Sequence, residues 1–391
     1  MRLGIYVHPW DLADEGAQNV LPKLASNGIE FINLAVSYHS GRFFLPHNPR
    51  RKIYNAEEGV VYFDPSNMHF SNSRIQPMKS KYYSNMDILK EAVDTARDYS
   101  ITVNAWTVCL HNAVFARDHC ELAVENLYGE ADANFLCPVK SDTRKYVTSL
   151  ISSLGAGYDI GEIELESAFF PSSFLHGSHH EVMGIRITPV ISYLLSTCFC
   201  QDCIANARGK GIDLKDARER AIKHVHDAIM SQAGITNPDA VNDLDLTKHL
   251  TESGFEDIMS HKKSISRDLL LEYSDAANQS GTGISVVSTS KGLLGSGVDL
   301  DFPSGTIEGL DLIAYFQNIP DISYDVAAIR KKVPDQTPIR AGINITYPYA
   351  YNPARLHQSV NAALSERADS IIFYNYGWAT ENIIKELKNL R

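Results

Sequence analysis

Residues 158–167 read YDIGEIELES, and this stretch says more about the fold than any other part of the chain. From position 162 to position 166 glutamate alternates with apolar residues, which is the period of a β-strand. Three glutamates therefore share one face. Glutamate is a poor strand former and like charges on one face repel, so a fold keeps this pattern where the face opens onto solvent or a site. An exposed edge strand is one interpretation. A strand that leads to a functional site is the other, and similar runs along the chain favour it.

Seven further apolar runs end in polar or aromatic residues. They occupy 3–8, 31–38, 102–110, 283–290, 312–317, 339–346 and 370–376. Helical patterns with apolar residues at three- and four-residue spacing cover 85–99, 141–154, 217–232, 264–279, 323–332, 353–367 and 380–390. Strands that alternate with helices indicate a parallel sheet, and eight of them predict an α/β fold, a closed (β/α)₈ TIM barrel. The alternative is a doubly wound open sheet, but no glycine-rich phosphate-binding sequence follows the first strand.

The residues beyond the predicted strands and helices of the barrel are distributed unevenly along the chain. Long insertions follow the second strand (39–84), the third strand (111–140) and the fourth strand, where a mostly helical excursion spans 167–280. All three follow the carboxyl ends of strands, which is the face on which barrel enzymes build their active sites. Because the chain shows no internal repeat, low-complexity tract or linker, residues 1–391 are predicted to form a single elaborated domain.

Composition limits the classes of partner. The 391 residues are 44% hydrophobic and 21% charged, and the formal net charge is -11, which argues against nucleic acid or an anionic membrane as a partner. No apolar run approaches the roughly 18 to 20 residues that span a bilayer. Since the N-terminus reads directly as a strand, with no export signal, we expect a cytoplasmic location. No organic cofactor is predicted. Barrels of this sort often self-associate, but no stripe of residues specifies a homo-oligomer interface.

If the barrel is correct, the strand ends converge on one pocket. Aromatic rings that stack on sugar C–H faces, with Asn, Gln, His and Arg side chains that bind hydroxyls, suit a carbohydrate pocket, although a Tyr or Trp at a strand end also suits packing. The candidate substrate-binding residues are His8, Trp10, Tyr38, His39, Arg42, Trp106, His111, Asn112, Tyr315, Gln317, Asn344, Tyr374, Asn375 and Trp378.

The carboxylates on the fourth strand are the sharper signal. Glycosidic bond cleavage needs an acid that protonates the leaving oxygen and a second group that stabilises or attacks the anomeric carbon. Repulsion between carboxylates two residues apart raises one pKa, which helps that residue hold a proton. Glu166, the last on the strand, is therefore predicted to be the general acid. Glu164 is predicted to be its electrostatic partner, and Glu162 to be structural.

The pattern acidic-x-acidic-x-Glu at the end of a fourth strand resembles the family-18 chitinases, in which the final Glu is the acid. Ala314-Tyr315-Phe316-Gln317 and Trp378 resemble that family's sixth-strand Tyr and terminal Trp. Glu164 stands where that family usually has Asp. The likeness therefore does not extend to attack by an N-acetyl group of the substrate.

A second resemblance covers residues 137–210. Leu136-Cys137-Pro138, then Thr143-Arg144-Lys145-Tyr146, then a strand that ends in Glu, then the C-x-C-x-x-C of residues 198–203 is similar to the family-42 β-galactosidases. The resemblance implies that Glu166 is the acid/base and that Cys137, Cys198, Cys200 and Cys203 bind a structural zinc. Three cysteines in so short a run of a large chain already indicate metal binding sooner than disulfides. Four thiolates would make a closed, structural site.

Family 42 places its nucleophile at the end of the seventh strand, but residues 339–346 contain no carboxylate. The nearest candidates for a second catalytic carboxylate are Asp299 and Asp301, on a loop after the fifth strand. Asp311 stands at the start of the predicted sixth strand, just before residue 312, so we expect it at the opposite end of the barrel. The chain also looks like poorly characterised glycosidase-like barrels that carry His-Asn, Asn-x-Tyr-Gly, Leu-Cys-Pro and Leu-Glu-Ser, found here at 111–112, 126–129, 136–138 and 165–167.

One further cluster, HGSHHE at residues 176–181, follows Glu166. His176 and His180 are predicted to line the sugar site and bind hydroxyls, although three His and a Glu could also bind a catalytic metal with Glu166. The leading hypothesis is a glycoside hydrolase acting on a small glycoside or oligosaccharide. The alternatives are a metal-dependent lyase, isomerase or hydrolase, and a carbohydrate-binding barrel without activity.

Overall fold

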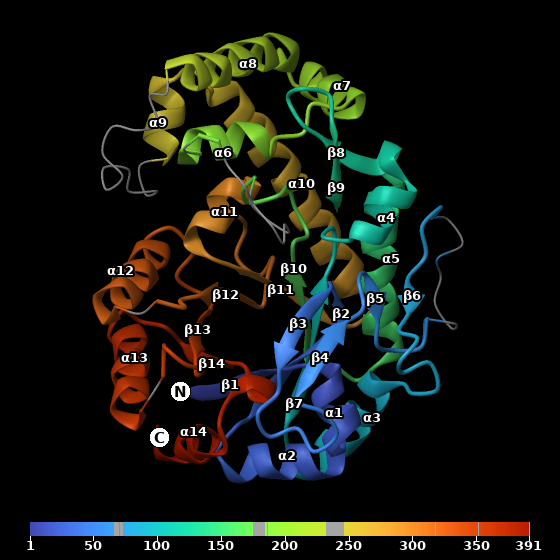
Figure 1. Ribbon diagram of the computed structural model, residues 1–391, viewed down its shortest axis with the longest axis vertical. Coiled ribbons are helices and arrows are strands. Elements are labelled where there is room, and N and C mark those ends of the chain that lie inside the picture. The colour runs from blue at the N-terminus through green and yellow to red at the C-terminus, as the bar shows by residue number, and fades with distance from the viewer. Residues whose placement is uncertain are drawn as a thin grey trace.

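A computed structural model describes residues 1–65, 70, 73–174, 184–185, 187–231, 246–316, 318–350 and 352–390. Within these residues, eight parallel strands close into a barrel, because β1 pairs with both β14 and β2 (Figure 1). The strands are β1 (Arg2–Val7), β2 (Phe31–Tyr38), β7 (Thr102–Val108), β10 (Glu162–Glu166), β11 (Gly283–Ser288), β12 (Gly309–Ile313), β13 (Ile339–Asn344) and β14 (Ser370–Tyr374). The predicted (β/α)₈ fold is confirmed, and the open doubly wound sheet is wrong.

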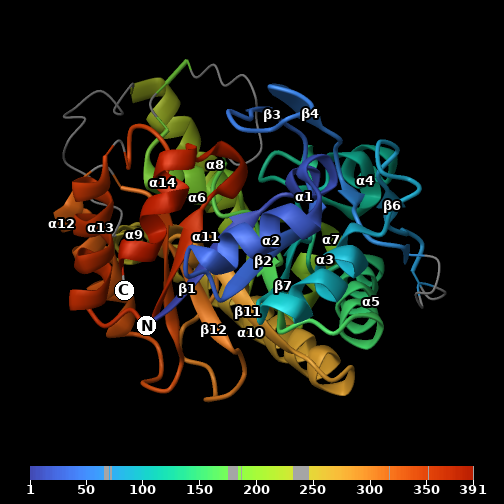
Figure 2. The same ribbon diagram turned by 90° about the horizontal axis from the view of Figure 1, so that it is seen from below.

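Helices pack on the outside of the strands, as Figures 1 and 2 show. They are α2 (Ala17–Ser26), α3 (Ile88–Ala96), α5 (Ser141–Gly157), α10 (Glu256–Gln279), α12 (Ile319–Arg330), α13 (Pro353–Ser365) and α14 (Glu381–Glu386). Side-chain caps explain where several begin: Asn352 accepts a hydrogen bond from the Arg355 N–H of α13, and Thr380 caps α14. None of the helices among the described residues is both long and apolar enough to cross a membrane.

The loops after the first four strands carry extra elements. α1 (Pro9–Glu15) follows β1, and the hairpin β3 (Gly41–Phe44) and β4 (Ile53–Ala56) follows β2 with β5 (Val60–Val61) and β6 (Met78–Lys79). After β7 come α4 (Ala113–Asp118), β8 (Ala123–Glu125) and β9 (Ala131–Leu136). After β10 come α6 (Pro189–Leu195), α7 (Gln201–Gly209), α8 (Leu214–Ser231) and α9 (Leu246–Glu252), which sit together beyond one end of the barrel (Figure 1). The loop after β11 forms α11 (Ser290–Ser296).

The glutamate strand β10 lies inside the barrel, between β7 and β11. Glu162 and Glu164 are buried, and Glu166 is half-buried at the carboxyl end. The exposed edge strand is therefore the wrong interpretation. Apolar neighbours on the other face, Ile163 and Leu165, are buried as well. A strand with both faces buried keeps three carboxyls only where other groups satisfy them.

Arg340 of β13 forms ion pairs with two of the carboxylates in the barrel interior. Its guanidinium lies 2.5 Å from Glu162 and also donates to both carboxylate oxygens of Asp311 on the neighbouring strand, where Asp311 and Arg340 are register partners. The prediction that Asp311 lies at the end of the barrel opposite the active face is wrong. β12 begins at Gly309, three residues before the predicted start, because Gly309 already pairs with Ser285 of β11. Asp311 is thus the third residue of its strand and its side chain lies in the barrel interior.

Candidate functional site

Glu166 lies at the carboxyl end of β10, where the barrel opens. The Trp106 indole N–H donates a hydrogen bond to Glu166 Oε2 at 2.6 Å. Burial raises the pKa of the Glu166 carboxyl, while nearby His39 and the hydrogen bond from Trp106 act to lower it. The net shift is upward. Glu166 therefore combines a fixed orientation with a tendency to keep its proton, which are the two properties of a general acid.

Glu164 lies one layer deeper than Glu166 and is fully buried. The Tyr6 hydroxyl donates to Glu164 Oε1 at 2.6 Å, and no described residue gives Oε2 a hydrogen bond that meets ordinary geometry. Burial raises the pKa of both Glu164 and Asp311, and their proximity raises that of Glu164 further. One guanidinium, that of Arg340, cannot neutralise three carboxylates. Burial and the nearby Asp311 therefore favour the protonated, neutral form of Glu164 beneath Glu166.

Three tyrosines surround Glu166 on the strand ends. Tyr315 and Tyr374 stack with ring centroids 4.8 Å apart, and Tyr38 packs edge-on against Trp106 at 5.1 Å. Burial raises the pKa of all three hydroxyls, and the Glu166 charge adds to the shift. They therefore stay protonated near neutral pH. Neutral phenols can donate hydrogen bonds to a sugar, but they are poor nucleophiles.

A stack of rings packs against these tyrosines, and sequence reasoning missed one of its members. Phe43, from the β3–β4 hairpin, lies over Trp10 (5.3 Å between centroids), Trp378 (5.2 Å) and His8 (5.5 Å) at interplanar angles of 19° to 28°. His8 and Trp10 are 0% exposed under this cover. No local pattern identifies Phe43, because a four-residue hairpin strand shows alternation but not what it packs against.

The polar residues predicted to bind substrate lie in different surroundings: some are near Glu166, one is exposed, and others form hydrogen bonds within their own loops. His39 stacks on His111 at 4.8 Å near Glu166, whereas Arg42 is exposed because it alternates with Phe43 on the hairpin. Two asparagines are used locally: Asn112 caps α4 and donates to the Gly59 carbonyl, and Asn344 Oδ1 accepts from the Thr346 N–H and hydroxyl. Gln317, His176 and His180 lie outside the described residues.

Asp299 and Asp301 lie on the loop that follows α11. Asp299 is 3.7 Å from the ammonium of Lys263 on α10, and the two side chains are 40% and 43% exposed. Asp301 is exposed, and its N–H donates to Asp299. Neither side chain lines the cavity beside Glu166, although Val298 of the same loop does. Glu166 lies at the strand ends beside the cavity and the aromatic residues, whereas Asp299 and Asp301 do not line that cavity.

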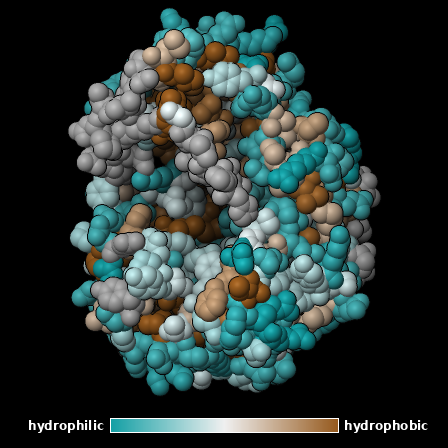
Figure 3. Space-filling model, viewed as in Figure 1, coloured by the Kyte–Doolittle hydropathy of each residue, from teal (hydrophilic) through white to brown (hydrophobic). Residues whose placement is uncertain are grey.

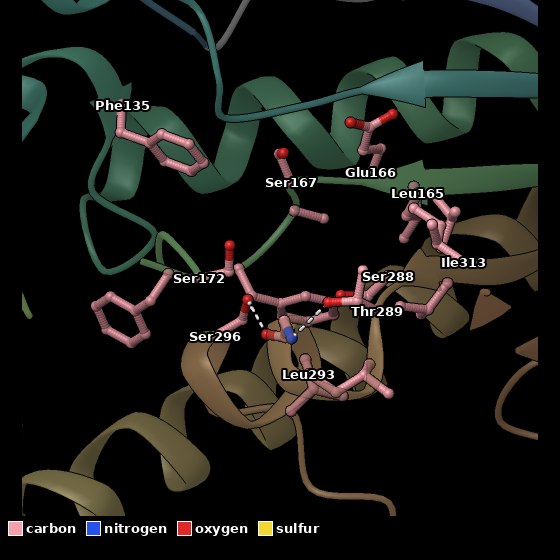
Figure 4. Close-up of a pocket in the computed structure, with 17 residues that line it drawn as sticks. Phe135, Leu165, Glu166, Ser167, Ser172, Ser288, Thr289, Leu293, Ser296 and Ile313 are labelled. Carbon is pink, nitrogen blue, oxygen red and sulfur yellow. Dashed lines mark hydrogen bonds between the residues drawn. The ribbon is translucent and has the colours of Figure 1, made fainter. Parts of the chain in front are cut away.

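A cavity of about 160 Å³ lies beside Glu166. Figure 4 shows Glu166 and Ser167 on one side of it and Ser288, Thr289 and Leu293 on the other. Its wall combines hydroxyls with apolar side chains, a mixture that suits a ligand with both hydroxyl groups and C–H faces. In the space-filling view, a hollow with hydrophobic residues at its base opens on this face between α11 and the strand ends (Figure 3).

Four cysteines form a separate, buried cluster. Cys137 follows β9, Cys198 and Cys200 precede α7, and Cys203 lies within its first turn. The Cys137 sulfur lies 3.6 Å from those of Cys198 and Cys203 and 3.8 Å from that of Cys200, and all four lie within 4.8 Å of one another. This geometry can hold a metal ion. Among the described residues, no other group of three or more metal-binding side chains gathers in this way.

Asp11 is a fully buried acid at the start of α1, near His8. Its Oδ2 accepts the His8 N–H at 3.0 Å, but Oδ1 has no hydrogen-bond partner among the described residues. Burial raises the pKa of Asp11 to about 8, and the negative charge of Glu15 adds to the shift. In the unfolded chain the pKa of an aspartate is about 3.9. Folding therefore takes up a proton between these two values, and stability falls as pH rises through that window.

Replacing Asp11 by Asn is expected to flatten this pH dependence, because the amide keeps the acceptor for the His8 N–H and has no proton to lose. The variant should gain thermal stability relative to the wild type at pH 8 and little or none at pH 5. Thermal unfolding at several pH values between 4 and 9 measures the difference. Parallel profiles for the two proteins would contradict the raised pKa.

No protein-family model matches the chain, and no curated protein sequence matches it. Three solved structures share its fold across 100% of its length: α-L-fucosidase isoenzyme 2 from Paenibacillus thiaminolyticus (11% identity, TM-score 0.57), the β-galactosidase of the Antarctic haloarchaeon Halorubrum lacusprofundi (9%, 0.56) and the β-galactosidase of Marinomonas ef1 (10%, 0.53). The chain corresponds to 49%, 57% and 59% of their respective lengths. The chain therefore has the barrel fold that these glycosidases have.

Proposed function

We propose that this protein is a glycoside hydrolase that acts on a small glycoside or oligosaccharide, with Glu166 as the general acid. The observation that carries the proposal is a carboxyl of raised pKa, fixed by the Trp106 N–H at 2.6 Å, at the open end of a barrel and among packed aromatic rings. A protonated carboxyl in that place can donate to a glycosidic oxygen. Shared architecture with a fucosidase and two β-galactosidases agrees with this class.

The surrounding groups have distinct roles in the proposal. The Trp106 N–H orients the Glu166 carboxyl, and the neutral hydroxyls of Tyr38, Tyr315 and Tyr374 donate hydrogen bonds to the sugar. Glu164 lies one layer deeper in the barrel, directly beneath Glu166. Because its neutral form is favoured, Glu164 adds no negative charge that would stabilise the oxocarbenium-like transition state, so that role falls to a second carboxylate. Asp299 and Asp301 stay the proposed sources of a second carboxylate, and they reach the substrate only if their loop turns inward.

The test is release of aglycone from a panel of aryl α- and β-glycosides by the wild-type protein and by Glu166→Gln. Turnover of at least one glycoside that disappears in the variant supports the proposal and names the sugar. Turnover that survives the substitution excludes Glu166 as the general acid. If the wild-type protein releases aglycone from no glycoside of the panel, the glycosidase assignment is wrong.

We also propose that the four cysteines bind a structural zinc ion. Zinc–thiolate bonds of about 2.3 Å place the sulfurs of a tetrahedral site about 3.8 Å apart, close to the 3.6 to 3.8 Å measured from Cys137. The site would join β9 to the start of α7, two segments about sixty residues apart. Such a closed site stabilises the fold and does not take part in the reaction.

Cys200→Ser is expected to lose the ion and to lower the free energy of unfolding by about 3 kcal/mol or more, because the remaining thiols would be left buried without their metal. Cys120→Ser is the matched control, since Cys120 is exposed and outside the cluster; we expect a change within about 0.5 kcal/mol. Elemental analysis should find one zinc per wild-type chain, and urea unfolding measures the stabilities. Wild-type protein without zinc, or equal stabilities of the two variants, would contradict the proposal.

A further inference from the structure

Three buried nitrogen atoms lie in the ring stack beneath Phe43, and none has a hydrogen-bond partner among the described residues. They are His8 Nε2, Trp10 Nε1 and Trp378 Nε1. Buried indole N–H groups usually find an acceptor, and leaving one without a partner costs free energy. Three such atoms in one stack are polar groups that a bound ligand could satisfy.

All three nitrogens are donors. Asn375 Oδ1 accepts the Gly377 N–H at 2.9 Å, so the Asn375 amide nitrogen must be the group that faces His8 Nδ1 at 3.0 Å. Since Nδ1 accepts that hydrogen bond, the neutral His8 ring carries its proton on Nε2. Burial lowers the pKa of His8 to about 3, so the ring is neutral near pH 7. A ligand of this cluster must therefore supply acceptor oxygens.

Phe43 covers this group of rings. Its six-membered ring lies nearly parallel to Trp10 and to Trp378, with centroids 5.3 Å and 5.2 Å away. A pyranose ring stacked on tryptophan has a similar size and orientation, but it also carries hydroxyl oxygens. The subsite adjoins the proposed acid, because the Trp106 ring lies 5.5 Å from His8 and its N–H holds Glu166.

The turn of the hairpin is anchored by contacts that do not involve Phe43. Asp14 of α1 accepts hydrogen bonds from Asn48 at 3.0 Å and from Arg51 at 2.9 Å, close to the turn between β3 and β4. Leu45, two residues after Phe43, is fully buried. A change of side-chain rotamer at Phe43 would uncover the stack without breaking these contacts.

We propose that a sugar ring binds in the space that the Phe43 ring fills, stacked on Trp10 and Trp378, and that Phe43 is an internal plug which the sugar displaces. The inference rests on the proposed function, since it names the subsite next to Glu166. The plugged form cannot bind, so the apparent dissociation constant exceeds the intrinsic one by the reciprocal of the open fraction.

Tryptophan fluorescence tests the plug directly, because the chain contains 3 tryptophans and Trp10, Trp106 and Trp378 all belong to this cluster. D-glucose, D-galactose and N-acetyl-D-glucosamine are titrated against the wild type, Phe43→Ala and Phe44→Ala. Phe44 is the matched control because it is 65% exposed on the outer face of the same hairpin. We expect Phe43→Ala to bind at least one sugar about tenfold more tightly than the wild type, and Phe44→Ala to bind it within twofold of the wild type.

A second variant tests the donors. In the Phe43→Ala background, Trp378→Phe keeps a ring but removes one N–H, and the dissociation constant should rise about fivefold, which corresponds to one ordinary hydrogen bond. An unchanged constant overturns the role of that N–H. Should Phe43→Ala lack a cooperative thermal transition, Phe43→Leu keeps the apolar volume without the flat ring and is titrated in the same way.

The inference is overturned if Phe43→Ala binds every sugar as weakly as the wild type, or more weakly. Glycoside hydrolysis by the wild type would then leave the proposed function intact. Tighter sugar binding by Phe43→Ala with no hydrolysis of any glycoside by either protein would have the opposite meaning: the subsite would stand, and the glycosidase assignment would fall.

Discussion

Glu166→Gln is expected to lower kcat/KM by about 10³-fold on an aryl glycoside with a poor leaving group, such as a phenyl glycoside. Glutamine keeps the size of the side chain and an acceptor for the Trp106 N–H, but it has no proton to give to the departing oxygen. A dinitrophenyl glycoside needs little protonation when its aglycone leaves, so the same variant should lose far less activity on it. Steady-state kinetics on both substrates measures the contrast.

One control variant accompanies this experiment. Glu308→Gln changes an exposed glutamate just before β12, at the opposite end of the barrel, and should leave both rates unchanged. Equal losses on the phenyl and dinitrophenyl glycosides in Glu166→Gln would show that Glu166 binds substrate without donating the proton.

The pH profile follows from the same residue. Because the acid must be protonated, activity should fall as pH rises through the raised pKa of Glu166. Trp106→Phe removes a hydrogen bond that favours the charged form, so the pKa of Glu166 should rise further and the basic limb should move to higher pH. A limb that stays in place would exclude the Trp106 N–H as a tuning group.

Arg340→Met is expected to lower the free energy of unfolding by about 3 to 5 kcal/mol. The Arg340 side chain is 11% exposed and is the cation shared by Glu162 and Asp311, so its loss leaves two buried carboxylates without a counter-charge. The fold can recover part of this loss only by protonating them. The destabilisation should therefore be larger at pH 8 than at pH 5, and urea unfolding at both values measures it.

Arg367→Met is the matched control, because the Arg367–Asp335 pair is exposed, with side chains 70% and 83% accessible, and surface pairs contribute about 0 to 1 kcal/mol. Adding Asp311→Asn to Arg340→Met should restore part of the lost stability by removing one orphaned charge. If Arg340→Met were no more costly than Arg367→Met, the carboxyls of the barrel interior would not depend on a shared guanidinium.

The amino-acid sequence by itself determined the barrel and its acid-bearing strand. Alternation of glutamate with apolar residues in 162–166, and eight apolar runs separated by helical patterns, depend only on local periodicity, which any segment carries with it. The spacing of Cys198, Cys200 and Cys203 is local in the same sense, whereas only a resemblance to a known family indicates the fourth thiol, Cys137. The strand end that carries Glu166 could also be identified, because the active face of a barrel follows from chain direction.

Only the tertiary structure decided which groups meet. It placed Asp311 beside Arg340 and Glu164, although a start of β12 three residues later would put it at the far end. It also brought Phe43 over His8 and Trp10, residues more than thirty positions away. Hydrogen-bond register between strands and the packing of a short hairpin depend on partners distant in sequence. No single segment contains that information, since the free energy that selects it comes from contacts formed only when the whole barrel closes.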